Sequence, residues 1–403
     1  MQDPATVAAV SDALVTAPAQ VAAVLAAVLA AVFALERVPA LGRVFAVFPG
    51  VLWAYFVPTL LTAAGITPQA SPAYDAMSYA LLPMSLFLVM LSIDLRAVAS
   101  LGRMATSMML VGAGSIVLGA PVAYLAVGQF IADPDAWKGL AALSGSWIGG
   151  TANMLAIQES VGLDSLGPII VVDTVVAYGW MAVLLALARR PGAFDRWTRA
   201  DPAALDSVNA ALARVDTARR PATTGTLAVI VGLGFAAAVL ARALGAEMPV
   251  LGTPPVVTAG TWAVLAAVTA GLALSLTPLR RLEADGASRV GYVALYLLLT
   301  SVGAQADLSS LLDAPLYLAA GLVWIAVHIA LLVLAAKLLR APLFFVATAS
   351  MAGIGGPVSA PVVAGAYHPA LAPVGLLMAV TGYVLGIYGG IAVAWMLGAL
   401  AGG

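Results

Sequence analysis

A series of apolar stretches, each long enough to cross a bilayer as one helix, most limits how this chain can fold. A spanning helix needs about 20 mostly apolar residues, and in lipid it must pair its own backbone polar groups. Ten stretches of the 403-residue chain fit this description, at residues 16–35, 44–65, 76–94, 104–131, 167–189, 223–245, 257–277, 289–306, 314–338 and 371–399. The sequence therefore predicts an all-α polytopic membrane protein with about ten spanning helices.

The composition narrows the function classes. Hydrophobic residues make up 63% of the chain and charged residues 9%, whereas soluble domains carry about 25% charged residues. A net charge of -1 gives no reason to expect nucleic acid as a partner. The absence of Cys and the wide separation of His328 and His368 argue against a metal site. The chain also lacks the metalloprotease, nucleophile-elbow and phosphate-loop motifs, so we expect neither an enzyme nor a cofactor other than a coupling ion.

Two further apolar segments, residues 139–162 and 342–367, each contain an Ile-Gly-Gly motif after a serine. Each Gly weakens a helix by about 1 kcal/mol relative to Ala, and the freed backbone groups need partners in protein or in a water-filled cavity. One such break would be ordinary close packing of helices. Two matched breaks predict re-entrant Gly-Gly hairpins around a polar site at mid-membrane, as in secondary transporters.

The longest polar stretch divides the chain into two similar halves. We predict a first repeat over 1–189, a linker over 190–222 and a second repeat over 223–403. Asp94-Leu95 and Asp307-Leu308 end corresponding spans of the two halves. In the linker, Leu205, Val208, Leu212 and Val215 recur at helical spacing, which predicts an amphipathic helix on the membrane surface.

The positions of basic residues predict the orientation of the two repeats. Basic residues favour the cytoplasmic side, and here they form clusters at Arg37/Arg43, Arg96/Arg103, 189–220, Arg280/Arg281/Arg289 and Lys337/Arg340. All five clusters lie on one side of the membrane only if each broken segment enters and leaves the bilayer from the same side. The linker is then cytoplasmic and the second repeat is inverted relative to the first. A broken segment that crosses the bilayer remains the alternative.

The residues beside the breaks are the candidate substrate site. A helix that begins there exposes unpaired N–H groups and a partial positive charge, which suits a carboxylate. Freed carbonyl groups at the same glycines can coordinate Na⁺. The candidate substrate-binding residues are Ser146, Gly149, Gly150, Thr151, Asn153, Gly355, Gly356, Ser359 and Thr381.

The candidate ion-coupling residues are Asp173, Ser144 and Ser350. Asp173 lies inside the span 167–189, and an ionisable residue within the membrane is a functional candidate. It could carry a proton or balance Na⁺. The alternative is an interfacial Asp near the end of a tilted helix.

Several motifs resemble a known family. The runs from Gly145 to Asn153 and from Ile354 to Ala364 are similar to the YjcL-like family of bacterial membrane proteins, catalogued as domain of unknown function 819. Shorter runs of the same resemblance are Leu91 to Leu95, Asp195 to Trp197 and Tyr367 to Val374. That family is uncharacterised and implies no activity. The hairpin followed by a Gly-rich final span resembles, more distantly, glutamate:sodium and citrate:sodium symporters, which implies Na⁺-coupled transport of an organic anion.

These observations predict a multi-pass secondary active transporter of the bacterial cytoplasmic (inner) membrane. We expect Na⁺-coupled symport of a small organic anion, with membrane lipid as surroundings. One bundle would carry the hairpins, and residues 16–65 and 223–277 would form a scaffold and a homodimer interface. The alternatives are a proton-coupled transporter or exporter, and a structural or assembly protein without a substrate. The second alternative offers no reason for two costly helix breaks.

Overall fold

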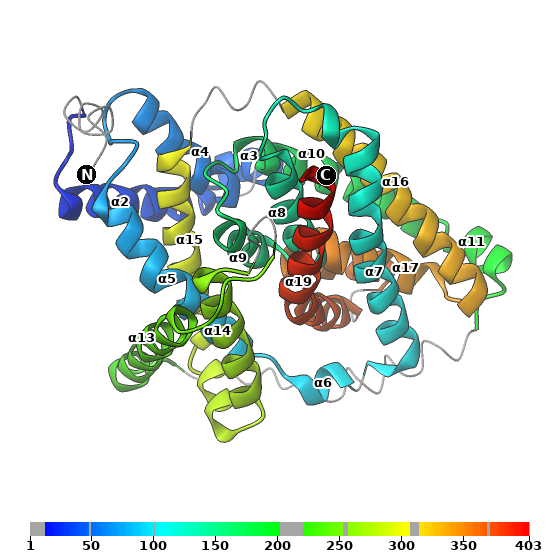
Figure 1. Cartoon of the computed structure of the whole chain (residues 1–403). Helices are drawn as coiled ribbons and strands as arrows, with labels where there is room; N and C mark the ends of the chain where they lie inside the picture. The colour runs from blue at the N-terminus through cyan, green and yellow to red at the C-terminus, as the bar shows by residue number, and fades with distance from the viewer. Residues whose placement is uncertain are drawn as a thin grey trace.

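The computed structural model describes residues 13–47, 50–99, 101–201, 221–252, 257–306, 314–368 and 371–402. Within these residues the chain is helical, and the one β feature is an isolated bridge between Leu251 and Val257. The predicted all-α polytopic class is therefore confirmed (Figure 1).

Eight helices in the described part are long and apolar enough to cross a membrane. They are α2 (Pro18–Glu36), α5 (Pro72–Leu91), α7 (Gly102–Ala126), α10 (Gly167–Ala188), α13 (Thr224–Ala246), α15 (Ala287–Gln305), α16 (Ala314–Leu339) and α19 (Ala372–Ala401). The other two predicted spans contain shorter apolar helices, α4 (Gly50–Ala63) and α14 (Ala259–Ser275). With 17 residues, α14 is about 26 Å long, a little less than the hydrocarbon core.

Local sequence signals account for several helix starts. Thr223 and Thr258 form capping boxes with Thr226 and Thr261 at the starts of α13 and α14. These reciprocal hydrogen bonds satisfy backbone N–H groups that have no partner inside the helix. The carboxylate of Asp94 accepts from the backbone N–H groups of Arg96 and Ala97, and so caps the short helix α6 (Leu95–Ala99). Residues 307–313, which contain the matching Asp307, lie outside the described part.

The helices form two bundles (Figure 1). In the first, which we call the scaffold, α5 packs against α13, α14 and α15, and α15 packs against α2 and α4. The second, which we call the hairpin bundle, contains α7, α10, α16, α19 and four shorter helices. Those four are α8 (Ala136–Gly149), α9 (Thr151–Val161), α17 (Leu343–Ile354) and α18 (Gly356–Tyr367). The expected scaffold of 16–65 and 223–277 was incomplete, because α5 and α15 form its centre.

Each bundle takes helices from both halves of the chain. The order α2, α4, α5, α7, broken α8–α9, α10 is matched by α13, α14, α15, α16, broken α17–α18, α19. This matched order is what the predicted duplication requires. The inverted orientation of the two halves and the side on which the linker lies stay predictions.

The first part of the linker lies against the hairpin bundle. After α10 the chain forms α11 (Pro191–Thr198), where the carboxylate of Asp195 accepts from the backbone N–H of Leu343 at 2.8 Å. The Lys337 ammonium donates to the Trp197 carbonyl. The expected amphipathic helix, with Leu205 to Val215, falls outside the described residues.

Candidate functional site

Both Ile-Gly-Gly motifs interrupt their helices as predicted. Gly150 separates α8 from α9 with a φ of 90°, and Gly356 begins α18 with a φ of 60°. Side chains of L-residues strongly disfavour these backbone angles, and the φ and ψ of Gly150 fall in a region used almost only by glycine. The two motifs are therefore breaks by backbone geometry as well as by helix propensity.

The first broken segment is a hairpin. A Cβ placed on Gly145 of α8 would lie 2.8 Å from the Asn153 carbonyl oxygen and 3.0 Å from Ile157 of α9. The two helices consequently pack side by side, with α9 folded back along α8. This geometry fits the predicted re-entrant hairpin for the first segment.

The two breaks meet. A Cβ on Gly356 would lie 3.8 Å from the Cα of Gly150, and one on Gly353 would lie 2.8 Å from the Trp147 carbonyl oxygen. Residues about 200 positions apart in sequence thus form one junction. The first turns of α9 and α18 both begin at this junction, so their free N–H groups lie close together.

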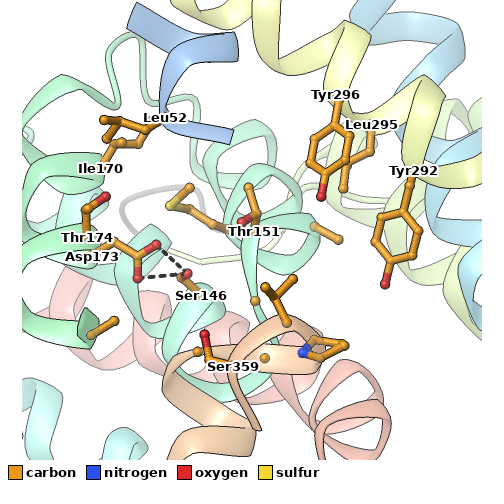
Figure 2. A pocket seen from close by; sticks show the side chains of 18 of the residues that line it. Leu52, Ser146, Thr151, Ile170, Asp173, Thr174, Tyr292, Leu295, Tyr296 and Ser359 are labelled. Carbon is orange, nitrogen blue, oxygen red and sulfur yellow. Dashed lines mark hydrogen bonds between the residues drawn. The ribbon is translucent and has the colours of Figure 1, made fainter. Parts of the chain in front are cut away.

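A cavity of about 630 Å³ lies next to the junction, between the two bundles (Figure 2). The hairpin bundle forms one wall of the cavity, and most of the predicted site residues lie in this wall. Those that line the cavity are Ser146, Gly150, Thr151, Asp173, Gly355, Gly356 and Ser359. The scaffold contributes the opposite wall from α2, α4 and α15.

Three of the other predicted site residues do not line the cavity; Gly149 and Asn153 are buried, and Thr381 is half-buried. Gly149 faces α19, where an added Cβ would overlap the Gly382 backbone and the Asn153 amide. Asn153 is fully buried, and its amide donates to the Tyr383 carbonyl at 3.2 Å. Thr381 donates to the Leu377 carbonyl one turn earlier and does not line the cavity. The Asn153 amide N–H and the Thr381 hydroxyl thus bond to helix carbonyls in this conformation, whereas the buried Asn153 Oδ1 has no hydrogen-bond partner among the described residues.

The predicted coupling residues Ser144 and Ser350 are also away from the cavity. Ser144 donates to the Ala141 carbonyl of its own helix. Ser350 accepts from the Trp180 indole N–H at 2.8 Å and contacts Nε2 of His328 at 2.8 Å. The other ring nitrogen of His328 contacts Ser115 at 2.6 Å. His328 is thus a buried residue that contacts Ser115 and Ser350, and no signal in the sequence indicates that Ser350 is one of its partners.

Asp173 is the only carboxylate among the described residues that line the cavity. The Ser146 hydroxyl donates to both of its oxygens, at 3.0 and 3.1 Å, and the Trp147 indole N–H donates at 3.0 Å. Trp147 is itself fully buried against Trp324. The ion pairs in the described part of the chain do not include Asp173. Neutral donors on one helix therefore hold a carboxylate that retains acceptor capacity toward the cavity.

Two arginines that sequence reasoning used only for topology line the same cavity. Arg37 follows the last residue of α2, and Arg289 lies in the first turn of α15. Both are exposed, and neither forms an ion pair with another described residue. Their membership of two predicted cytoplasmic clusters was the available signal, but nothing local shows that α2 and α15 bring them together.

An aromatic wall faces the hairpin junction from the scaffold (Figure 2). The ring of Tyr296 lies 5.4 Å from Phe33 and 6.1 Å from Tyr292, measured between centroids. The Tyr292 hydroxyl contacts the Tyr383 hydroxyl of α19 at 2.7 Å. The cavity thus has polar groups on the hairpin side and mainly aromatic and aliphatic groups on the scaffold side.

A second cavity, of about 570 Å³, lies farther along α9 and α15. Met154 of α9 and Leu295 of α15 line the first cavity, whereas Leu155 and Leu298 line the second. All four side chains are buried. The two cavities are therefore separated by an apolar layer between the hairpin bundle and the scaffold.

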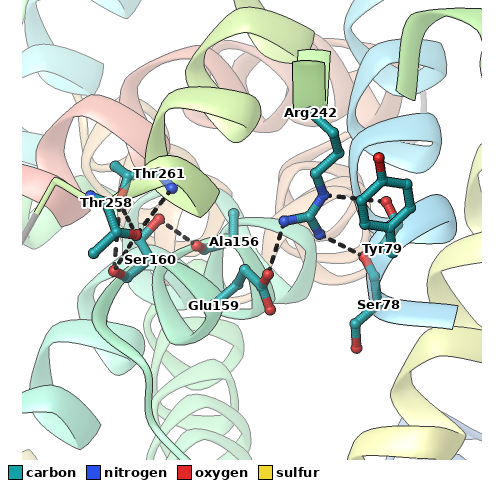
Figure 3. A network of polar contacts seen from close by, with 8 residues as sticks. All are labelled: Ser78, Tyr79, Ala156, Glu159, Ser160, Arg242, Thr258 and Thr261. Atoms are coloured by element: carbon teal, nitrogen blue, oxygen red, sulfur yellow. Dashed lines mark hydrogen bonds and ion pairs between the residues drawn. The ribbon is translucent and has the colours of Figure 1, made fainter. Parts of the chain in front are cut away.

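A polar network closes the bundles against each other beside the second cavity (Figure 3). Arg242 of α13 pairs with Glu159 of α9 at 3.0 Å and donates to the Ser78 and Tyr79 carbonyls of α5. On the other side of α9, the hydroxyls of Thr258 and Thr261 donate to the Ser160 carbonyl. No local signal in the sequence identifies Arg242 as the partner of Glu159, because the two residues lie on helices far apart in the chain.

The fold and site define a polytopic helical membrane protein with two broken helices that meet at a cavity between two bundles. The chain belongs to the family described as protein of unknown function (DUF819), which matches residues 23–400. It is also 27% identical over 350 residues to the uncharacterized membrane protein YjcL of Bacillus subtilis (strain 168), covering 82% of this chain and 85% of that protein. The resemblance predicted from the sequence motifs is thereby confirmed.

Proposed function

We propose that this protein is a secondary active transporter of the bacterial cytoplasmic membrane, which moves a small carboxylate-bearing organic anion by Na⁺-coupled symport. The observation that carries the proposal is the meeting of Gly150 and Gly356 at a cavity between two bundles. Broken helices at a repeat interface are the usual binding site of secondary transporters. A purely structural membrane protein would gain nothing from two such interruptions, each of which costs helix stability.

Electrostatics favour a carboxylate as the recognised group. The first turns of α9 and α18 present positive dipole ends, with N–H donors at Thr151 and at Gly356, Val358 and Ser359, since Pro357 has no N–H. Arg37 and Arg289 add two positive charges to the opposite wall. A cavity with low-dielectric walls and cationic lining concentrates anions.

A buried oxygen without a partner supports Na⁺ as the coupling ion. Among the described residues, Asn153 Oδ1 has no hydrogen-bond partner, although Asn153 is fully buried beside the first break. An unsatisfied buried acceptor costs about 1–3 kcal/mol, and oxygens at unwound helices are the groups that coordinate Na⁺ in transporters. Asp173, which has no cationic partner in the described part of the chain, is the second candidate and would carry a proton.

The two cavities support alternating access. Exposed Arg37 and Arg289 mark the first cavity as the one on the predicted cytoplasmic side, and the Arg242–Glu159 contact closes the other side. Movement of the hairpin bundle along the scaffold would break the Arg242–Glu159 contact and join the junction to the second cavity. The conformation described is then the cytoplasm-facing one.

The decisive experiment has two stages. Purified full-length protein is first screened by thermal unfolding against small organic acids, with and without Na⁺; a stabilising acid is then tested for uptake into proteoliposomes under a Na⁺ gradient. Accumulation that requires the Na⁺ gradient is the expected result. Stabilisation by no organic acid under either condition contradicts a carboxylate substrate. Accumulation that requires only a proton gradient would mean that protons, carried by Asp173, drive transport in place of Na⁺.

A further inference from the structure

We infer that the substrate also carries an ammonium group, held by Asp173, and that it is an amino acid with an apolar or aromatic side chain. This inference rests on the proposed function, because it assumes that the hairpin junction binds a carboxylate. It adds a second recognised group and a side-chain pocket. Three features of the cavity carry it.

The first feature is the charge pattern of the lining. Arg37, Asp173 and Arg289 are the charged residues that line the cavity. The two cations lie on scaffold helices, whereas the carboxylate lies on α10, beside the hairpin junction. A simple organic anion would find Asp173 repulsive within the site. A ligand that carries both charges turns the same carboxylate into an attractive contact.

The second feature is the way in which Asp173 is held. Its donors are the neutral hydroxyl of Ser146 and the neutral indole of Trp147. These contacts orient the carboxylate without neutralising it, and Trp147 cannot move easily because it is fully buried. A carboxylate at membrane depth is costly unless it is paired. A bound ammonium would supply that pairing through charge-assisted hydrogen bonds.

The third feature is the relation between the carboxylate, the hairpin junction and the aromatic wall. Figure 2 shows Asp173, Thr151 and Ser359 around one space, with Tyr292 and Tyr296 across it. A small amino acid placed there can direct its carboxylate to the helix ends and its ammonium to Asp173. Its side chain then meets Phe33, Tyr296 and Leu295. Aromatic rings favour apolar and aromatic groups through their large contact area.

The test compares matched ligands that differ by one charged group. Phenylalanine, hydrocinnamate and phenethylamine form one set; leucine, isocaproate and isoamylamine form the other. Each is titrated against purified full-length protein in saturating Na⁺, with affinity read from thermal stabilisation and checked by calorimetry. We expect at least one amino acid to bind about tenfold or more tightly than its acid without the amine, because a charge-assisted hydrogen bond is lost. The amines should bind more weakly than the amino acids.

Asp173→Asn tests whether Asp173 is the residue that distinguishes an amino acid from the matched acid without the amine. The variant should lose about tenfold in affinity for the amino acid and keep the wild-type affinity for the matched acid. Asp135→Asn is the control, since Asp135 is a partly exposed carboxylate at the far end of α8, away from the cavity, and its ion pair in the described part of the chain is with Lys138. If Asp173 served only for ion coupling, Asp173→Asn would change the affinity of both ligands equally, which contradicts the inference.

The outcomes separate the inference from the proposed function. Wild-type protein that binds hydrocinnamate or isocaproate as tightly as the amino acid overturns the ammonium assignment and leaves carboxylate transport standing. Binding of the amines alone, or of no ligand in either set while other organic acids do bind, also overturns it. If no carboxylate of any kind stabilises the protein, the proposed function fails together with the inference. The wild-type comparison decides the matter even if Asp173→Asn does not fold.

Discussion

Single residues of this protein show how backbone geometry and hydrogen bonding divide polar groups between function and packing. Gly150 and Gly356 hold positive φ angles at the junction of the hairpins, where Ser359 and Thr151 reach the cavity. Asn153, only three residues after Gly150, turns instead toward α19. Neighbours in sequence therefore have different roles because α9 presents different faces to the cavity and to the core.

Replacement of Gly150 or Gly356 by Leu should abolish uptake. A branched side chain at these φ values costs about 1–3 kcal/mol and displaces the start of α9 or α18 from the cavity. Gly179→Leu is the matched control, because Gly179 lies on exposed surface of α10 with open space around it. Proteoliposome uptake and expression level are measured for all three variants. Wild-type uptake by both junction variants would mean that these glycines serve only helix packing.

His328→Leu should destabilise the protein by about 1–3 kcal/mol and leave the ion dependence of transport unchanged. The substitution removes the partner that Ser115 and Ser350 share in the buried interior of the hairpin bundle. Each hydroxyl loses one buried hydrogen bond, while Ser350 keeps the Trp180 indole N–H and Ser115 keeps the Gly112 carbonyl. Unfolding in detergent measures the stability, and uptake at several pH values measures the coupling. A loss of proton dependence with normal stability would instead make His328 part of a proton path.

At the scale of elements, the second arm of the first hairpin connects the site to the rest of the molecule. Residues of α9 line both cavities, and α9 contacts α5 and α14 of the scaffold. Any change that moves α9 relative to the scaffold must break the polar network of Figure 3. Changes in this network should therefore alter the free-energy difference between the state open to the first cavity and the state open to the second.

Glu159→Gln should increase access to the junction from the side of the second cavity. The change removes a partly buried ion pair while keeping the size of the side chain, so the closed state loses stability. The chain has no Cys, so a single Leu155→Cys substitution can report access through its rate of labelling by a membrane-impermeant maleimide.

Lys138→Gln is the control for that measurement, because it removes the more exposed pair with Asp135. Exposed pairs contribute little to stability. Faster labelling in Glu159→Gln, with no change in Lys138→Gln, is expected. Equal labelling in all backgrounds would mean that the Arg242–Glu159 contact does not hold the second cavity closed.

At the scale of the whole molecule, two bundles drawn from both halves of the chain meet along a limited interface. The scaffold centres on α5 and α15, and the hairpin bundle centres on α7, α8, α16 and α19. Both cavities lie between these bodies. A rigid movement of one bundle past the other can therefore change which cavity reaches the junction without repacking either interior.

The predicted orientation places the linker after α10 in the cytoplasm. Single Ala193→Cys and Gln69→Cys variants should differ in intact cells. Both positions are exposed, but residues 66–75, which follow the predicted span 44–65 and contain no basic residue, are expected on the side opposite the linker. Gln69→Cys should react with an impermeant thiol reagent, whereas Ala193→Cys should react only after permeabilisation. The reverse pattern would overturn the orientation and place the first cavity on the outer side.

The sequence by itself determined the helices and their breaks. Apolar length predicted the spanning segments, and Ile-Gly-Gly predicted the interruptions at Gly150 and Gly355, because hydropathy and glycine act locally. Two of the predicted spans contain the shorter helices α4 and α14. Only the tertiary structure decided that Arg37 and Arg289 line the same cavity as Asp173, that Ser350 bonds His328, and that Glu159 pairs with Arg242. Those relations depend on which face each helix turns toward helices far away in sequence, and packing across the whole bundle sets that rotation.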